Sequence, residues 1–382
     1  MFNNRLRGGE FLVIFVLGNI IDMRKSDWFN LILLAFVIGC RFHTPLADFY
    51  AERLYPVISA GLSFVASWLP FSFEEIVVGS YILALIVILI VAVVKNQGFW
   101  HWLGKTVLAT LSLVVWMYIG WGTNYFRTPL YTRMDVQPAS YDEMAFSRFL
   151  TDYTRDLNAS AGTAVAFERY KLEESIKEFY SANLTEYGYT ALRPWQHVKN
   201  PLLNPLYSAV GVQGFMGPFF CESQLNMDLP EVEVPFTMAH ELAHLAGVTS
   251  EAEANYWAYV YCSQSDVPGV CYSGYLALLP YVSTSASTLL SEAQYATWSA
   301  YVSPKAKADY AANREFWDSK RVKVVDSIQR WMMDQFLKTN GVAEGAKDYY
   351  GVIGMIMTLN PKQEFSAPVR DYSDNGAVLM EI

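Results

Sequence analysis

Two histidines four residues apart, with a glutamate beside the first, are the residues of this chain best suited to chemistry. His240, Glu241 and His244 form the pattern His-Glu-x-x-His, and the whole chain holds only five histidines. On a helix, residues four apart lie on one face, so both imidazoles can bind one metal ion. Glu241 projects beside that ion and can take a proton from an attacking water. The pattern predicts a Zn²⁺ site of the hydrolase type, and the alternative is an ordinary polar helix face that carries two histidines.

A catalytic zinc site needs a third protein ligand, and two glutamates are available for this role. Gly247 is placed to end the first helix, and Ser250 to begin a second one. Ser250 also stands where the pattern H-E-x-x-H-x-x-G-x-x-H would need a third histidine, so that class is excluded. Glu253 lies at capping-box spacing from Ser250, which gives it a structural role. Glu251 has no such role, so the sequence favours Glu251 as the third ligand, with Glu253 as the alternative.

Further polar residues are candidates for supporting roles. Asn255 follows Glu251 by one helical turn, a position from which its amide can orient the carboxylate. Amide hydrolysis also needs a group that stabilises the oxyanion. Tyr350 is predicted for this role, and His197 and Tyr275 are its rivals.

Apolar segments near the N-terminus predict a membrane anchor. The chain has 382 residues, of which 53% are hydrophobic and 17% charged. The uncharged run 76–94 is long enough to cross a bilayer, and the segments 105–123 and 26–44 are the other expected spans. We therefore expect an anchor over residues 1–126. The rest, 127–382, is long enough to bury a core of its own.

Basic residues predict how this anchor is oriented. Arg24 and Lys25 precede the first expected span, and Lys95 and Lys105 bracket the loop between the second and the third. By the positive-inside rule both places are cytoplasmic, which puts the chain after Tyr125 outside the cytoplasm. A net charge of −9 without a basic patch argues against nucleic acid. The expected partners are the lipid bilayer and a peptide or protein substrate.

The fold class expected is mainly α, with transmembrane helices followed by a zincin-like, predominantly helical domain that holds a small β element. The expected helices after the anchor are 141–157, 167–182, 237–246, 251–264, 272–279, 291–301, 304–338 and 346–359. Strand signals lie at 210–216 and 219–225, and they are equally typical of a small hairpin and of an irregular loop. In the hairpin, Glu222 and Asn226 are expected to line the cleft.

Two of the four cysteines are placed for a disulfide. Cys262 and Cys271 are separated by a polar loop on the side expected to face away from the cytoplasm. A disulfide and a pair of free thiols fit this spacing equally well. Cys221 is expected to be a buried small hydrophobe.

The order of these features resembles a bacterial family of uncharacterised membrane-anchored HExxH proteins that are regarded as zinc metallopeptidases. The resemblance is carried by the stretches Gly214-Phe215-Met216-Gly217-Pro218-Phe219, Pro235 to His244, Gly247 and Glu251 to Asn255. More distantly, Glu251 with Asn255 is similar to the Glu-x-x-x-Asp element of CAAX-type prenyl proteases, whose glutamate binds zinc, although Asn stands here in place of Asp. The resemblance implies a membrane-anchored bacterial protein and no substrate. With the basic residues described above, the expected location is the bacterial cell membrane, as a multi-pass protein with its catalytic domain outside the cytoplasm.

These observations predict a membrane-anchored zinc metallopeptidase that hydrolyses peptide bonds with an activated water. The alternative is a catalytically silent zinc-binding or peptide-binding scaffold at the cell envelope. Glu241 favours the enzyme, because a scaffold needs the histidines but has no use for the acid.

Overall fold

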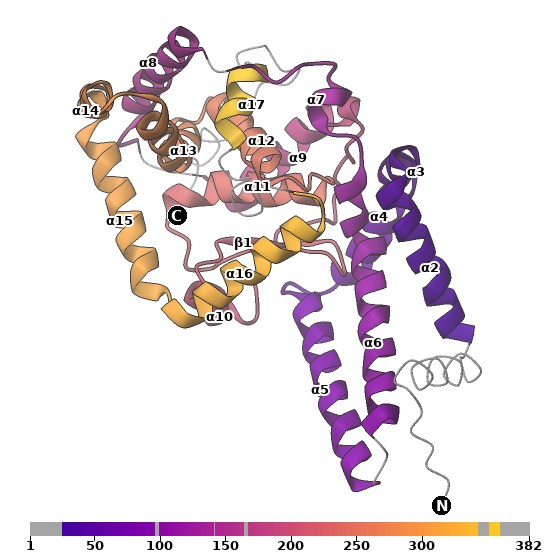
Figure 1. The fold of residues 1–382 in the computed structure, drawn as a ribbon. Coiled ribbons are helices and arrows are strands. Elements are labelled where there is room, and N and C mark those ends of the chain that lie inside the picture. The colour runs from indigo at the N-terminus through magenta and orange to yellow at the C-terminus, as the bar shows by residue number, and fades with distance from the viewer. Residues whose placement is uncertain (1–24, 96–98, 141, 164–166, 343–350, 360–382) are drawn as a thin grey trace, which may run out of the picture.

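The structure of the protein is a computed structural model that describes residues 25–95, 99–140, 142–163, 167–342 and 351–359. It is mainly helical, and its described part contains one two-stranded sheet (Figure 1). Two long N-terminal helices project from a larger body of packed helices. The predicted fold class is confirmed to this extent.

The N-terminal helices include those that are long and apolar enough to cross a membrane. Among the described residues these are α5 (Phe73–Val94) and α6 (Phe99–Gly120). A bent pair is the candidate third span. Its first half is α2 (Lys25–Phe42), and its second half is a helical run of α3 (Thr44–Phe49), a π-helical turn at 50–54 and α4 (Tyr55–Ala66). The chain bends by 118° between the two halves. The three expected spans therefore coincide with α2, α5 and α6.

The remaining helices build the body. They are α7 (Leu130–Arg133), α8 (Glu143–Ser160), α9 (Arg169–Asn183), α10 (Asn204–Ala209), α11 (Val234–Leu245), α12 (Glu251–Ser263), α13 (Pro268–Leu289), α14 (Glu292–Tyr301), α15 (Pro304–Lys320), α16 (Lys323–Thr339) and α17 (Val352–Leu359), with 3₁₀ turns at 122–126, 185–187 and 231–233. Helices α11 and α12 lie at the centre, where α11 packs against α9, α12, α13 and both strands. Nearly every side chain of α11 is buried.

The prediction of a single long helix over 304–338 is wrong. Arg321 and Val322 have extended backbones and divide it into α15 and α16. The amide of Val322 donates to the carbonyl of Ala209 at 2.8 Å, which holds the break beside the end of α10. A tertiary hydrogen bond thus overrides a continuous helical pattern.

The strand signals form a hairpin. Strands β1 (Gly214–Gly217) and β2 (Glu222–Leu225) pair antiparallel, with Gly214 opposite Leu225 and Gly217 opposite Glu222. Lys199 forms a bridge to Gln224 on the other side of β2, so β1 is the outer strand of the described sheet. Of the two expected alternatives the hairpin is confirmed, with shorter strands.

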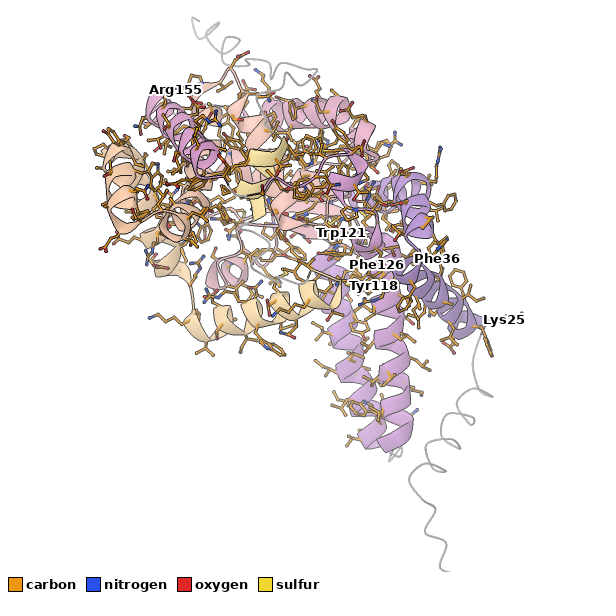
Figure 2. The ribbon with its side chains drawn as sticks, turned by 45° about the horizontal axis from the view of Figure 1, so that its top comes forward. Lys25, Phe36, Tyr118, Trp121, Phe126 and Arg155 are labelled. Carbon is orange, nitrogen blue, oxygen red and sulfur yellow. The ribbon has the colours of Figure 1, made fainter. Side chains whose placement is uncertain are left out.

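The N-terminal helices bond directly to the central helix of the body. The indole N–H of Trp121 donates to the carbonyl of His244 at 2.8 Å, and the hydroxyl of Tyr55 donates to the carbonyl of Leu245 at 2.7 Å. Figure 2 shows Tyr118, Trp121 and Phe126 gathered where α6 meets the body, and the rings of Tyr118 and Phe126 are stacked. These contacts run across residue 126, and the division of the chain at that residue stays a prediction.

All four cysteines lie in the described part, and all four are free thiols. The disulfide considered for Cys262 and Cys271 is therefore not formed. Cys262 is fully buried, and its Cβ occupies the space that a side chain at Gly274 would need. Cys262 therefore packs between α12 and α13 and is not part of the loop that precedes Cys271.

Candidate metal centre

The helix that carries the histidines is closed at its end by a glycine. Gly247 has a φ of +102°, a conformation that favours glycine. The amides of Gly247 and Val248 donate to the carbonyls of His244 and Ala243 at 3.0 and 3.1 Å, which closes α11 and turns the chain toward α12. A Cβ at Gly247 would also lie only 3.2 Å from the ring of Tyr55. This tight turn brings the first residue of α12 back to the histidines.

Three ligand atoms meet at one point between α11 and α12. The Nε2 atoms of His240 and His244 are 3.0 Å apart, and Oε2 of Glu251 lies 3.1 and 3.4 Å from them. All three side chains are buried. In a tetrahedral zinc site with ligands about 2.0–2.1 Å from the ion, neighbouring ligand atoms are about 3.3–3.4 Å apart. The spacing therefore fits a single ion, and the two histidines lie on a buried face of α11.

The hydrogen bonds of the imidazoles suit metal binding. Nδ1 of His244 lies 2.8 Å from the carbonyl of Val248, so its N–H donates there and Nε2 is left facing His240 and Glu251. Nδ1 of His240 is buried and has no hydrogen-bond partner among the described residues. Two imidazole nitrogens and a carboxylate oxygen packed this closely need a shared cation, either a proton or a metal ion, to offset their repulsion.

The electrostatics of the metal-free group indicate the same need for positive charge. Burial by itself would lower the pKa of His244, but the Glu251 carboxylate raises it to about 9. Burial would raise the pKa of Glu251, yet the nearby His244 and His240 hold it well below its usual range. The site thus attracts a proton strongly, and a metal ion that binds must displace that proton.

Glu241 lies directly beneath the outer strand. A Cβ placed on Gly214 would lie 2.5 Å from Oε1 of Glu241 and 2.6 Å from its Cγ, so only glycine leaves room for this carboxylate. Burial raises the pKa of Glu241 to about 7, against the opposing effect of the two histidines. Gly214 was not singled out as a functional residue from the sequence, since its role depends on the register of β1 over α11.

The alternative ligand, Glu253, is engaged elsewhere. Its carboxylate accepts a hydrogen bond from the hydroxyl of Tyr189 and lies 3.9 Å from the guanidinium of Arg133. The guanidinium groups of Arg127 and Arg133 lie over the Tyr189 ring at 4.6 and 4.3 Å. The structure thus brings Glu251 to the histidines and holds Glu253 in a separate ion-pair cluster.

A cavity of about 810 Å³ opens beside the three-ligand group. His240, Glu241 and Asn255 line one end of it, and residues 206–215 and helix α16 line its walls. The Nδ2 amide of Asn255 is buried and has no hydrogen-bond partner among the described residues, so it is a donor available to a bound molecule. The expected hydrogen bond from this amide to the Glu251 carboxylate is therefore not formed, and the side chain of Asn255 lies on the cavity wall.

The expected oxyanion stabilisers lie away from this cavity or outside the described residues. Tyr350 belongs to the segment 343–350, which the structure does not describe. The hydroxyl of Tyr275 lies 3.4 Å from the carboxylate of Asp156, and its ring packs on Tyr153 and Tyr259. The structure therefore does not bring Tyr275 to the metal ligands.

The other rival, His197, belongs to a second acidic group. Glu173, Glu174 and His197 offer ligand atoms that are close enough to hold a metal. However, the ammonium of Lys177 lies among them, 2.7 Å from Glu173, 2.9 Å from Glu174 and 3.4 Å from Nδ1 of His197. Lys177 already supplies the positive charge, so this group is an ion-pair cluster that needs no metal.

Glu222 and Asn226 do not line the cavity as expected. The carboxylate of Glu222 accepts the amides of Phe73 and Glu74 at 3.2 and 2.8 Å, which caps the start of α5. The ammonium of Lys199 lies 2.5 Å from the same carboxylate. Asn226 donates to the carbonyl of Val212 at 2.9 Å and so holds the loop before β1. Both residues are structural, and Glu222 joins the sheet to the first long apolar helix.

Residues 50–357 match the model of a family described as a protein of unknown function, DUF3810. The chain belongs to this family. The match begins in the π-helical turn before α4 and ends in α17, so it covers α5, α6 and all the residues of the three-ligand group. No curated protein and no solved structure is significantly similar to the chain. The expected resemblance to an uncharacterised family is confirmed, and the likeness to zincins and CAAX-type proteases stays a prediction.

Proposed function

We propose that this DUF3810 protein is a membrane-anchored zinc metallopeptidase. His240, His244 and Glu251 would hold Zn²⁺, and Glu241 is the general base. The observation that carries the proposal is the buried triangle of two imidazole nitrogens and one carboxylate oxygen with edges of 3.0, 3.1 and 3.4 Å. Zn²⁺ bound there would supply a Lewis acid that polarises the peptide carbonyl and makes water more acidic.

The proton transfers are assigned to one side chain. Glu241 takes a proton from the water that attacks the peptide carbonyl carbon, so the new C–O bond forms as the water loses that proton. When the C–N bond breaks, Glu241 returns the proton to the departing amine, and the carboxylate is regenerated. Burial under Gly214 holds this carboxylate at a fixed place at the end of the cavity.

Asn255 and the outer strand are placed to hold the substrate. The free Nδ2 amide of Asn255 can donate to the carbonyl oxygen on which negative charge develops. Gly214 and Phe215 of β1 line the same cavity, where an extended peptide can pair with the outer strand. These two features supply the orientation that hydrolysis needs beyond the base and the metal ligands.

We also propose that α2, α5 and α6 cross the bacterial cell membrane. Helix α5 begins at the body and α6 ends at it, so Lys95, directly after α5, and Lys105, in the second turn of α6, lie toward the ends of these helices that are far from the body. By the positive-inside rule those ends are cytoplasmic and the body lies outside the cytoplasm.

The test uses the full-length protein in detergent and compares four chains. Zinc content and hydrolysis of a mixture of fluorogenic peptides are measured for the wild type, Glu241→Gln, Glu251→Ala and Glu253→Ala. We expect zinc in the wild type, loss of hydrolysis but not of zinc in Glu241→Gln, and loss of zinc in Glu251→Ala. Glu253→Ala is the matched control from the same helical turn, and it should keep zinc.

Three outcomes count against the proposal. No zinc in the wild type refutes the metal site, and loss of zinc in Glu253→Ala but not in Glu251→Ala refutes the ligand assignment. Stoichiometric zinc without hydrolysis of any peptide supports the silent scaffold instead.

A further inference from the structure

Helix α16 presents two different faces. One face lines the cavity with Asp326, Gln329, Arg330 and Met333. The other carries an exposed apolar stripe with the spacing of a single helix face, formed by Val324, Val325, Ile328, Trp331 and Met332. Trp331 has 64% of its surface exposed. The side of α16 away from the cavity is therefore apolar, which is unusual for a surface in contact with water.

The C-terminal end of α16 is tied directly to helices that we propose to cross the membrane, and its N-terminal end is tied to α10. At its C-terminal end, Arg41 of α2 donates to the carbonyl of Thr339 at 2.7 Å, and the hydroxyl of Tyr118 in α6 donates to Asn340 at 2.8 Å. At its N-terminal end, Val322 bonds to the end of α10.

The start of α10 is joined in turn to α5. The amides of Leu202 and Leu203 donate to the carboxylate of Glu75 at 2.7 and 3.0 Å. Beside this junction lie further exposed apolar side chains: Leu202, Leu203, Leu206 and Met227. The apolar surface of α16 therefore continues through α10 to the first turn of α5.

These ties place α16 along the plane of the membrane surface. Helix α5 begins, and α2 and α6 end, at the contacts just described, so all three reach the body at the same level. In Figure 1 α16 crosses the direction of α5 and α6 at the edge of the body from which they project, with α10 beside it. A helix tied to the ends of membrane spans in this way lies at the depth of the lipid headgroups.

We propose that the apolar stripe of α16, with the exposed leucines beside α10, lies in the interfacial layer of the bilayer that α5 and α6 cross. Since the reverse face of α16 is a wall of the cavity, the cleft opens at the membrane surface. Its substrates are polypeptide segments that are anchored in that membrane or lie on it. The substrate class rests on the proposed peptidase function, whereas the docking of α16 rests on the membrane anchor alone.

Docking is tested with a fluorescent label at single introduced cysteines in the full-length chain. The chain is reconstituted in phosphatidylcholine vesicles with or without brominated acyl chains. Ile328→Cys reports on the stripe. Leu83→Cys, 61% exposed on α5, reports on the span, and Met144→Cys, 70% exposed on α8, is the control far from the membrane. The unsubstituted chain gives the background from the four native thiols, of which three are buried.

We expect brominated lipid to quench Leu83→Cys and Ile328→Cys by about half or more and to leave Met144→Cys unchanged. Quenching at Leu83→Cys but not at Ile328→Cys overturns the docking and leaves the anchor intact. A label at Ile328→Cys that is shielded from water without bromine quenching also overturns it, and indicates a second copy of this chain on the stripe. No quenching at Leu83→Cys refutes the anchor itself.

The substrate class is tested by cleavage of one fluorogenic peptide mixture in two forms, free in solution and joined to a palmitoyl chain in the vesicles. We expect the wild type to prefer the vesicle-bound form, and Ile328→Asp to lower its kcat/KM about tenfold while leaving the free peptides unaffected. Met144→Asp is the matched control and should change neither.

An equal loss on both forms, or a wild type that prefers free peptides, overturns the substrate class. If the wild type cleaves neither form, the peptidase proposal fails, and the quenching result still decides the docking.

Discussion

Gly214→Ala is expected to remove most of the activity without removing the metal. The added Cβ would lie 2.5 Å from Oε1 of Glu241, whereas ordinary contacts begin at 3.4 Å, so the carboxylate must retreat by about 0.9 Å (3.4 − 2.5). A misplacement of about 1 Å in a catalytic group costs roughly 10²-fold in rate. We therefore expect kcat/KM to fall about 100-fold, which corresponds to about 2.7 kcal/mol of transition-state stabilisation.

The assay measures kcat/KM for peptide hydrolysis together with zinc content in the same preparation. Gly354→Ala is the matched control, because a Cβ at Gly354 meets nothing within 4 Å and its backbone is helical. It should leave both quantities unchanged. Wild-type kcat/KM in zinc-loaded Gly214→Ala would refute the reasoning, since Glu241 would then not depend on the space left by this glycine.

Three further predictions follow from the contacts of the site and of its supports. A chain limited to 127–382 lacks Tyr55 of α4 and Trp121 directly after α6, whose side chains bond the last carbonyls of α11, so we expect it not to bind zinc. Stoichiometric zinc in this fragment would contradict that. Lys199→Met removes the ion-pair partner of the buried Glu222 carboxylate and should lower the free energy of unfolding by about 3–5 kcal/mol. Lys338→Met breaks an exposed ion pair and should lower it by less than about 1 kcal/mol. Both are measured by chemical unfolding in detergent, and equal effects would contradict a structural role for the Lys199–Glu222 pair. The pKa of His244 is raised to about 9 in the metal-free chain, and zinc must displace this proton, so zinc affinity should rise about tenfold per pH unit between about pH 6 and about pH 8. A zinc affinity that does not change with pH in a chelator competition assay would show that His244 is not the group that zinc deprotonates.

The same pKa has a consequence for the stability of the metal-free chain. The folded-state pKa of His244 lies above its ordinary value of 6.5, so its contribution to stability is complete below about pH 6.5 and is lost as the pH rises toward about 9. The raised pKa of Glu241 acts in the same direction over a lower range, because burial of its ionised form is unfavourable. Zinc should therefore raise the melting temperature more at high pH than at low pH.

The parts of the site that were predictable are those governed by local helix geometry. His240 and His244 share a face because they are four residues apart on a helix, whatever surrounds it. The end of α11 at Gly247 follows from the preference of glycine for positive φ. The apolar helices α5 and α6 likewise follow from their length and composition alone.

Other features depend on contacts between distant residues and had no local signal. Glu222 has no sequence mark that distinguishes a residue lining a cleft from one that caps the long apolar helix α5, which begins 149 residues earlier. Lys177 pairs with Glu173 and Glu174 of its own helix by local spacing, but only the tertiary structure brings His197 to this group. The break between α15 and α16 depends on the hydrogen bond from Val322 to Ala209.

The sequence by itself determined that His240, Glu241 and His244 would share one helix and that long apolar helices would precede it. Both features depend on spacing and composition along a single segment. Only the tertiary structure decided between Glu251 and Glu253, which lie in the same turn of α12. The angle between α11 and α12 directs Glu251 to the histidines, while Tyr189 and Arg133 hold Glu253 away. The tertiary structure also decided which face of α16 lines the cavity, because the direction in which a helix face points depends on what anchors the two ends of the helix.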